Sequence, residues 1–259
     1  MKILDCENIE SINSSLEGIM DISESEIKEF LLNLNMDQYY DTHQAYPGTG
    51  DELLIHLFEE KYKKHYKIDI TYWFHLTRTF EYNRFTEGIL PTGENINLIC
   101  DFLFSLVDHK LTKKEWNKFR EKLESDEKNS HADQYRLRIN KTYSGPFAIL
   151  NKAFAFIADG VGSYDYLKRG SEVVECICNY FDEIYEYNLL QLYIGNTKPC
   201  IVKFRFNGGK SNYIGNILYY LYSIYHNEKL SVHCSNCFDG KGIRVPHENI
   251  LNIEFIDNY

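Results

Sequence analysis

The stretch Ile68–Pro91, IDITYWFHLTRTFEYNRFTEGILP, decides how the rest of the chain is interpreted. Its first half is dominated by alternating, β-branched and aromatic residues, which predicts a strand. This strand ends on His75-Leu76-Thr77-Arg78, an amphipathic turn or short helix is expected over 80–87, and Gly88 ends it. Polar side chains therefore gather where a buried strand reaches the surface, a position at which rigid scaffolds often present chemistry.

A strand ending in His-x-Thr-Arg, a short helix and then Gly-Ile-Leu-Pro resembles the first strand and helix of the ADP-ribosyltransferase fold. The resemblance covers about 24 residues. It implies that His75 holds the nicotinamide-side ribose of NAD, with Thr77 and Arg78 beside it. A core strand with a capped end, in which His75 is only a structural hydrogen-bonding residue, explains the same short motif.

Two further positions follow from this resemblance. The segment YSGPFAILNKAFA looks similar to the family's second strand and helix, which implies that the ring of Tyr143 stacks on nicotinamide. The third position is an acid, normally Glu on a late strand, that stabilises the cation developing on the ribose as nicotinamide leaves. Here the late strand carries Asp239, and Glu172 or Glu175 at a helix start are the other candidates. For Glu175, a first-turn carboxylate that stabilises its helix is the favoured interpretation.

The resemblance implies a protein that binds NAD as its substrate and cleaves its glycosidic bond. ADP-ribose would pass to a macromolecule, protein or nucleic acid, or to water. Low-GC bacteria and phages use such chains in toxin and defence systems. The alternative from a different class is a non-catalytic interaction or defence protein that keeps the fold without a complete acid, so enzymatic activity stays open.

A two-histidine phosphoesterase acting on a cyclic or 2′,3′-phosphate is a second alternative. His75-Leu76-Thr77 and His233-Cys234-Ser235 both place a histidine two residues before a hydroxyl on an expected strand. In such enzymes one histidine acts as general base and the other as general acid. The two histidines would have to face each other on neighbouring strands.

A metal site is a less favoured interpretation. Histidines and cysteines gather near the C-terminus, at His226, His233, Cys234, Cys237 and His247. Structural zinc sites use two ligand pairs, and only one Cys-x-x-Cys pair is present. Buried thiols explain these cysteines better, and no bound metal is expected.

Composition narrows the class of protein. The chain has 259 residues, 44% of them hydrophobic and 25% charged, which is typical of a globular domain. A formal net charge of −10 argues against a general electrostatic nucleic-acid binder. With neither a signal peptide nor a membrane-spanning run expected, the seven cysteines are expected to be reduced in the cytoplasm. The oligomeric state is left open.

Helices and strands alternate irregularly, which favours an α+β fold over a doubly wound α/β fold. The resemblance implies a split mixed or antiparallel sheet of ADP-ribosyltransferase type with several surrounding helices. We expect a helical N-terminal appendage over 1–66 and an α+β domain over 67–259 with a helical insertion at 94–130. Alternation predicts a strand at 135–142 and composition predicts a helix at 147–158.

Overall fold

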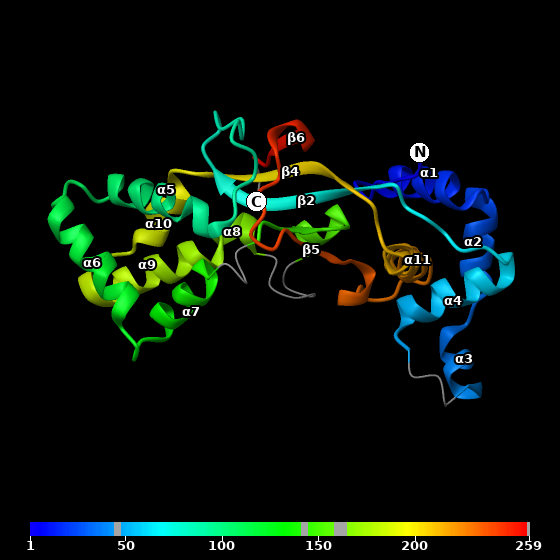
Figure 1. Cartoon of the computed structure of the whole chain (residues 1–259). Coiled ribbons are helices and arrows are strands. Elements are labelled where there is room, and N and C mark those ends of the chain that lie inside the picture. The colour runs from blue at the N-terminus through cyan, green and yellow to red at the C-terminus, as the bar shows by residue number, and fades with distance from the viewer. Residues whose placement is uncertain (44–47, 141–144, 158–164, 258–259) are drawn as a thin grey trace. The chain divides into compact units, whose positions relative to one another are not determined.

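The computed structural model describes residues 1–43, 48–140, 145–157 and 165–257, and this part of the chain has an α+β fold. Its strands form a six-stranded, mostly antiparallel sheet in the order β5-β3-β2-β4-β6, with β1 paired to β2 off this path (Figure 1). The predicted fold class is therefore confirmed. The strands are β1 (Ile3–Leu4), β2 (Ile70–Thr79), β3 (Phe147–Ile149), β4 (Lys198–Asn207), β5 (Cys237–Asp239) and β6 (Ile250–Phe255).

Strand β2 is the strand predicted from the opening stretch. It pairs in parallel with β1 and antiparallel with β3, where Phe74 lies opposite Ile149. Trp73 and Phe74 point to opposite faces and both are buried, so the sheet is covered on both sides at this point. After Leu76 the side chains of β2 are only partly buried. The polar end of the strand is therefore less completely covered by other side chains than its centre.

The chain divides into two compact units, each built from three segments. Unit 1 comprises Met1–Phe74, Ile149–Tyr164 and Phe204–Phe238, and unit 2 comprises His75–Ala148, Asp165–Lys203 and Asp239–Tyr259. One boundary between the units lies within β2 and another lies within β4, so each of these two strands contributes residues to both units. Residues 1–66, which we expect to form a helical appendage, belong to unit 1 together with two later segments.

Unit 1 is organised around helix α11, which packs against α2, α4 and the 3-10 helix η3. A Cβ atom added at Gly215 of α11 would lie 2.5 Å from the carbonyl oxygen of Asp51 in α4, so this close approach requires glycine. The helices of unit 1 are α1 (Ile9–Met20), α2 (Glu24–Asn33), α3 (Met36–Thr42), α4 (Gly50–Tyr62) and α11 (Ser211–Tyr225), with η3 at Val232–Cys234.

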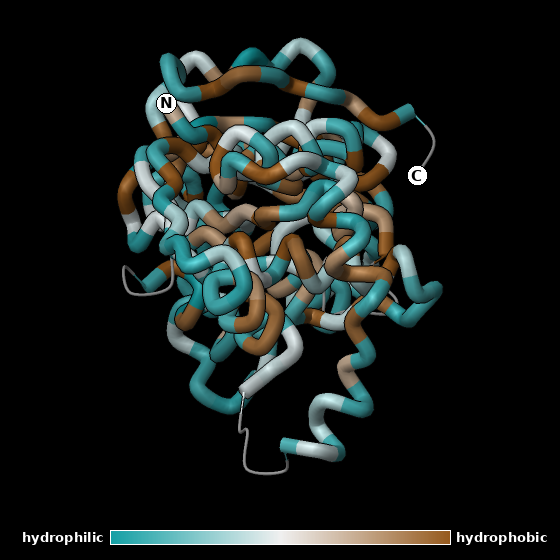
Figure 2. Tube along the Cα trace, turned by 90° about the vertical axis from the view of Figure 1, so that its right-hand side faces the viewer, coloured by the Kyte–Doolittle hydropathy of each residue, from teal (hydrophilic) through white to brown (hydrophobic). Residues whose placement is uncertain are grey.

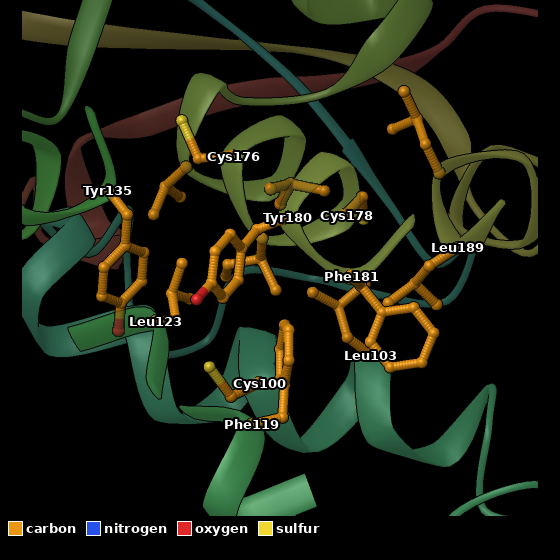
Figure 3. Close-up of a cluster of buried hydrophobic side chains, with 14 of the residues drawn as sticks. Cys100, Leu103, Phe119, Leu123, Tyr135, Cys176, Cys178, Tyr180, Phe181 and Leu189 are labelled. Carbon is orange, nitrogen blue, oxygen red and sulfur yellow. The ribbon is translucent and has the colours of Figure 1, made fainter. Parts of the chain in front are cut away.

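Unit 2 contains a buried cluster of hydrophobic side chains between helices. Figure 3 shows Phe119 of α6 beside Tyr180 and Phe181 of α9. The ring centroid of Phe119 lies 5.7 Å from that of Tyr180 and 5.2 Å from that of Phe181. Helix α7 packs along α9 and contributes the buried Tyr135. The helices of unit 2 are α5 (Thr92–Ser105), α6 (Lys113–Ser125), α7 (Ser130–Ile139), α8 (Tyr166–Arg169), α9 (Glu172–Tyr185) and α10 (Leu189–Gly195).

Helix α7 corrects one sequence prediction. Residues 135–139, which alternate like a strand, continue the helix that begins at Ser130. The Asn129 side chain accepts hydrogen bonds from the amides of His131 and Ala132 at 2.9 and 3.2 Å, which caps the helix. Ala132 and Tyr135 are buried three residues apart, the spacing of a helix face. The predicted strand is therefore wrong in its described part.

The segment after Gly145 corrects a second prediction. In place of a helix from residue 147, the chain forms strand β3 and then the 3-10 helix η2 (Lys152–Phe156). The Leu150 amide donates to the carbonyl oxygen of Asn236 at 2.9 Å, beside the pairing of β3 with β5. Sheet pairing therefore overrides the helix propensity of this Ala-rich segment. Residue 158, the last of the predicted helix, lies outside the described residues.

Hydrophobic and hydrophilic residues are interspersed along the helices (Figure 2). Within the described residues, no helix is both long enough and apolar enough to cross a lipid bilayer. None of the seven cysteines forms a disulfide; six are buried and Cys237 is exposed.

Candidate functional site

The candidate site begins with His75, the first residue of β2 that belongs to unit 2. Its Nδ1 atom lies 2.7 Å from the carbonyl oxygen of Phe147 in β3. A carbonyl oxygen can only accept, so Nδ1 carries the proton and the neutral ring has its lone pair on Nε2. Burial lowers the pKa of His75, and this effect exceeds the opposing effect of the hydrogen bond to Phe147. Near neutral pH, His75 is therefore an uncharged ring fixed in one orientation, with Nε2 as a hydrogen-bond acceptor.

This lowered pKa predicts a pH dependence of stability. The pKa of histidine in an unfolded chain is near 6.5, and in the folded chain that of His75 is lower. Below about pH 6.5 the unfolded chain binds a proton that folded His75 does not, so the free energy of unfolding falls with falling pH. We expect His75→Asn to lose stability less steeply than the wild type between about pH 7 and 5 in urea titrations. Above about pH 8 the difference between the two proteins should be constant; equal slopes below pH 7 would contradict the assignment.

Arg78 lies three residues further along β2, and its guanidinium is held entirely by protein groups in the described residues. Nε donates to the Thr197 hydroxyl at 3.2 Å and Nη1 to the Leu167 carbonyl at 2.5 Å. Nη2 donates to the carbonyl oxygens of Ile194 and Thr197 at 2.9 and 2.8 Å. Burial lowers the pKa of Arg78. Four of its five N–H groups thus donate to residues in or next to α8 and α10. We infer that Arg78 fastens β2 to these helices.

Thr77 and Tyr143 are the other two residues predicted to bind the cofactor. The Thr77 hydroxyl lies 3.5 Å from the carbonyl oxygen of Arg78, at the limit of hydrogen bonding, and the residue is partly buried. Tyr143, the predicted stacking residue, lies outside the described residues. The role of Thr77 beside His75 therefore stays a prediction.

Asp239, one of the two predicted catalytic acids, ends strand β5 and is exposed. Its carboxylate accepts a hydrogen bond from the Lys241 amide at 2.8 Å. The ring of Phe238 packs on that of Trp73, with centroids 5.5 Å apart, so these two side chains share one face of the sheet. His75 follows Trp73 by two residues and Asp239 follows Phe238 by one. Strand alternation therefore directs Asp239 to the face opposite His75.

Glu172, the other predicted acid, is the first residue of helix α9. Its carboxylate forms an ion pair with Nε of Arg138 at 2.8 Å, and both side chains are about one-third exposed. Glu175, one turn later, pairs with Arg169, and burial raises the pKa of Glu175 more than Arg169 lowers it. Among the described residues, no carboxylate contributes to the pKa shift of His75. Glu172 therefore stays a candidate for the catalytic acid, although no contact between it and His75 is observed among the described residues.

Unit 1 contains a polar cluster around Asp51 that the sequence analysis missed. The buried Asp51 carboxylate accepts from the Thr49 hydroxyl at 2.6 Å and from Nδ2 of Asn216 at 2.8 Å. Nδ1 of His233 lies 3.5 Å from the same carboxylate, and the Asn236 amide donates to Oδ1 of Asn216 at 3.0 Å. The sequence pattern that could have pointed to this region is the capping box of Thr49 with residue 52, which places Asp51 in the first turn of α4. Asp51 can orient the His233 ring through Nδ1.

Among the described residues, no three His, Cys, Asp or Glu side chains converge on a position that could hold a metal ion. Comparison of the chain with protein-family models, curated proteins and solved structures finds no match. A function therefore has to be inferred from the residues of this chain.

Proposed function

We propose that the chain binds NAD through His75 and cleaves the bond between nicotinamide and ribose, passing ADP-ribose to a macromolecule or to water. The observation that carries this proposal is the uncharged His75 ring, fixed by the Phe147 carbonyl, with Nε2 as an acceptor. A ribose hydroxyl is a donor that such a nitrogen binds at a defined angle. This agrees with the role that the ADP-ribosyltransferase resemblance implies for the histidine.

The reaction needs a fixed negative charge. As the glycosidic bond breaks, its electron pair leaves with the nicotinamide nitrogen and the ribose carbon becomes an oxocarbenium ion. A nucleophile of the acceptor then bonds to this carbon and loses a proton to solvent. We assign the stabilising carboxylate to Glu172, because strand alternation directs Asp239 to the face opposite His75 and the ion pair with Arg138 holds the Glu172 side chain in place.

The first test measures NAD binding by thermal shift and nicotinamide release by chromatography. We expect NAD to raise the melting temperature of the wild type. His75→Asn should abolish the shift, and Glu172→Gln should slow nicotinamide release by about 100-fold while keeping binding. His247→Asn is the matched control, because Nδ1 of His247 also bonds a backbone carbonyl, that of Phe85, at 2.9 Å. Wild-type protein that neither binds NAD nor releases nicotinamide would overturn the proposal.

A second candidate function is the two-histidine phosphoesterase. Nδ1 of His75 faces a carbonyl oxygen and Nδ1 of His233 faces a carboxylate, which leaves Nε2 of each ring as the nitrogen for proton transfer. The strand predicted at His233 is wrong, because this residue lies in the 3-10 helix η3. Hydrolysis of 2′,3′-cyclic nucleotides by the wild type, lost in both His75→Ala and His233→Ala, would support it. If the protein binds NAD without releasing nicotinamide, the non-catalytic alternative is favoured instead.

A further inference from the structure

Strand β6 lies at one edge of the sheet, beside β4, in the described part of the chain (Figure 1). The amide of Ile256, the residue after β6, donates to the carbonyl oxygen of Pro199 in β4 at 3.0 Å. Backbone groups of successive strand residues point alternately to the two sides of the strand. The N–H and C=O groups of Leu251, Ile253 and Phe255 therefore point away from β4, toward the open edge.

This edge lacks two of the features by which edge strands usually avoid pairing, and its one charged side chain is that of Glu254. The segment Ile250–Phe255 contains no proline and no lysine, and Leu251 is 43% exposed. The strand has six residues, whereas β5 at the other edge has three. An extended row of backbone donors and acceptors of this length is a template for another strand.

The sequence of β6 is complementary to itself in one antiparallel register. Several registers pair outward-facing residues with each other, and the one that pairs all three places Ile253 opposite its own copy and Leu251 opposite Phe255. On the other face, Asn252 then lies opposite Glu254, and Ile250 opposite Ile256. Every apolar residue meets an apolar one, and the acid meets an amide instead of a second acid, which would be destabilising.

We infer that β6 binds a second copy of this chain, forming an antiparallel strand pair about a two-fold axis at Ile253. The partner is a copy of the chain because every residue of the strand finds a matching residue in its own sequence at this register. The sheet then continues across the interface with three hydrogen-bonded residue pairs. A contact of one strand with one strand belongs to the small, transient interfaces, below about 1,200 Å², so the dimer fraction should rise with concentration.

Sedimentation velocity across a concentration series tests this inference. The wild type should shift from monomer to dimer, and Ile253→Asp should weaken the dimer by at least about tenfold because two carboxylates then face each other. Ile243→Asp is the matched control: Ile243 is also in unit 2, is 72% exposed and lies outside β6, so this variant should dimerise like the wild type. A wild type that stays monomeric up to about 1 mM, or an Ile253→Asp variant that dimerises normally, overturns the inference.

Hydrogen exchange of the wild type gives a readout that needs no variant. At low concentration the amides of Leu251, Ile253 and Phe255 should exchange faster than those of Asn252 and Glu254. At high concentration the first three should become protected as the second strand pairs with them. Protection that does not change with concentration would overturn the proposed pairing.

Discussion

Trp116→Ala is expected to lower the free energy of unfolding by about 3–5 kcal/mol, the largest effect of any single substitution considered. The Trp116 side chain is completely buried in the helical cluster of unit 2. Its ring lies 5.1 Å from that of Phe119 and 5.9 Å from that of Phe181, between α6 and α9. Alanine would leave a cavity that these rings cannot fill without moving. Urea unfolding followed by far-ultraviolet circular dichroism measures the change, because the substitution removes one of the two tryptophan fluorophores.

Two further variants, Trp116→Phe and Leu98→Ala, serve as controls for Trp116→Ala. The indole Nε1 of Trp116 is buried and has no hydrogen-bond partner among the described residues. Trp116→Phe removes this unpaired donor and keeps an aromatic ring, so it should cost only about 1 kcal/mol. Leu98→Ala, at a position in α5 that is 61% exposed, should change stability by less than about 0.5 kcal/mol. If Trp116→Ala were no worse than Leu98→Ala, the cluster would not be the stabilising core of unit 2.

Arg78→Lys should destabilise the protein by about 3 kcal/mol although the charge is kept. The guanidinium reaches acceptors on three separate residues, Leu167, Ile194 and Thr197, through its fixed fork of N–H groups. A lysine ammonium lacks this planar fork, so it cannot replace all of these hydrogen bonds at once. Urea unfolding at pH 7 measures the loss.

Arg84→Lys is the control for this substitution. Arg84 is exposed, lies six residues after Arg78 and makes one long contact, 3.4 Å to the Glu81 carbonyl. It should tolerate lysine within about 0.5 kcal/mol. The result also decides between two roles for Arg78. Weaker NAD binding by Arg78→Lys with unchanged stability would restore the cofactor-binding role that the resemblance implies, and lost stability supports the fastening role.

Local signals in the sequence were sufficient for many helices and strands. Ser23 and Thr112 each stand three residues before a glutamate, the local pattern of a capping box, and both boxes are present: each hydroxyl accepts from an amide three residues on, and each glutamate accepts from the cap amide. Strand β2 also forms as predicted. The strand predicted at 135–142 was wrong because Arg136 and Arg138 alternate with apolar residues, whereas the Asn129 cap and packing on α9 favour the helical spacing of Ala132 and Tyr135.

The candidate site could be predicted only in part, for a related reason. The sequence places His75 correctly in a strand, since period-two alternation is a local signal, but the strand continues for four residues beyond it, to Thr79. The acceptors of Arg78 lie 89 to 119 residues away along the chain, so no local pattern reveals that its donors are occupied. The face on which Asp239 lies depends on the register of β5, which is fixed by its neighbours and not by its own residues.

The division of β2 and β4 between the two units limits how the chain can be shortened. Each unit is assembled from three stretches that alternate along the sequence, so any continuous fragment that contains all of one unit also contains parts of the other. A fragment starting at residue 67 would lack α4, whose backbone lies against Gly215, and would uncover the apolar side of α11. Activity assays on such a truncated polypeptide would report on a partly unfolded protein, so point substitutions in the full-length chain are the sound route to its function.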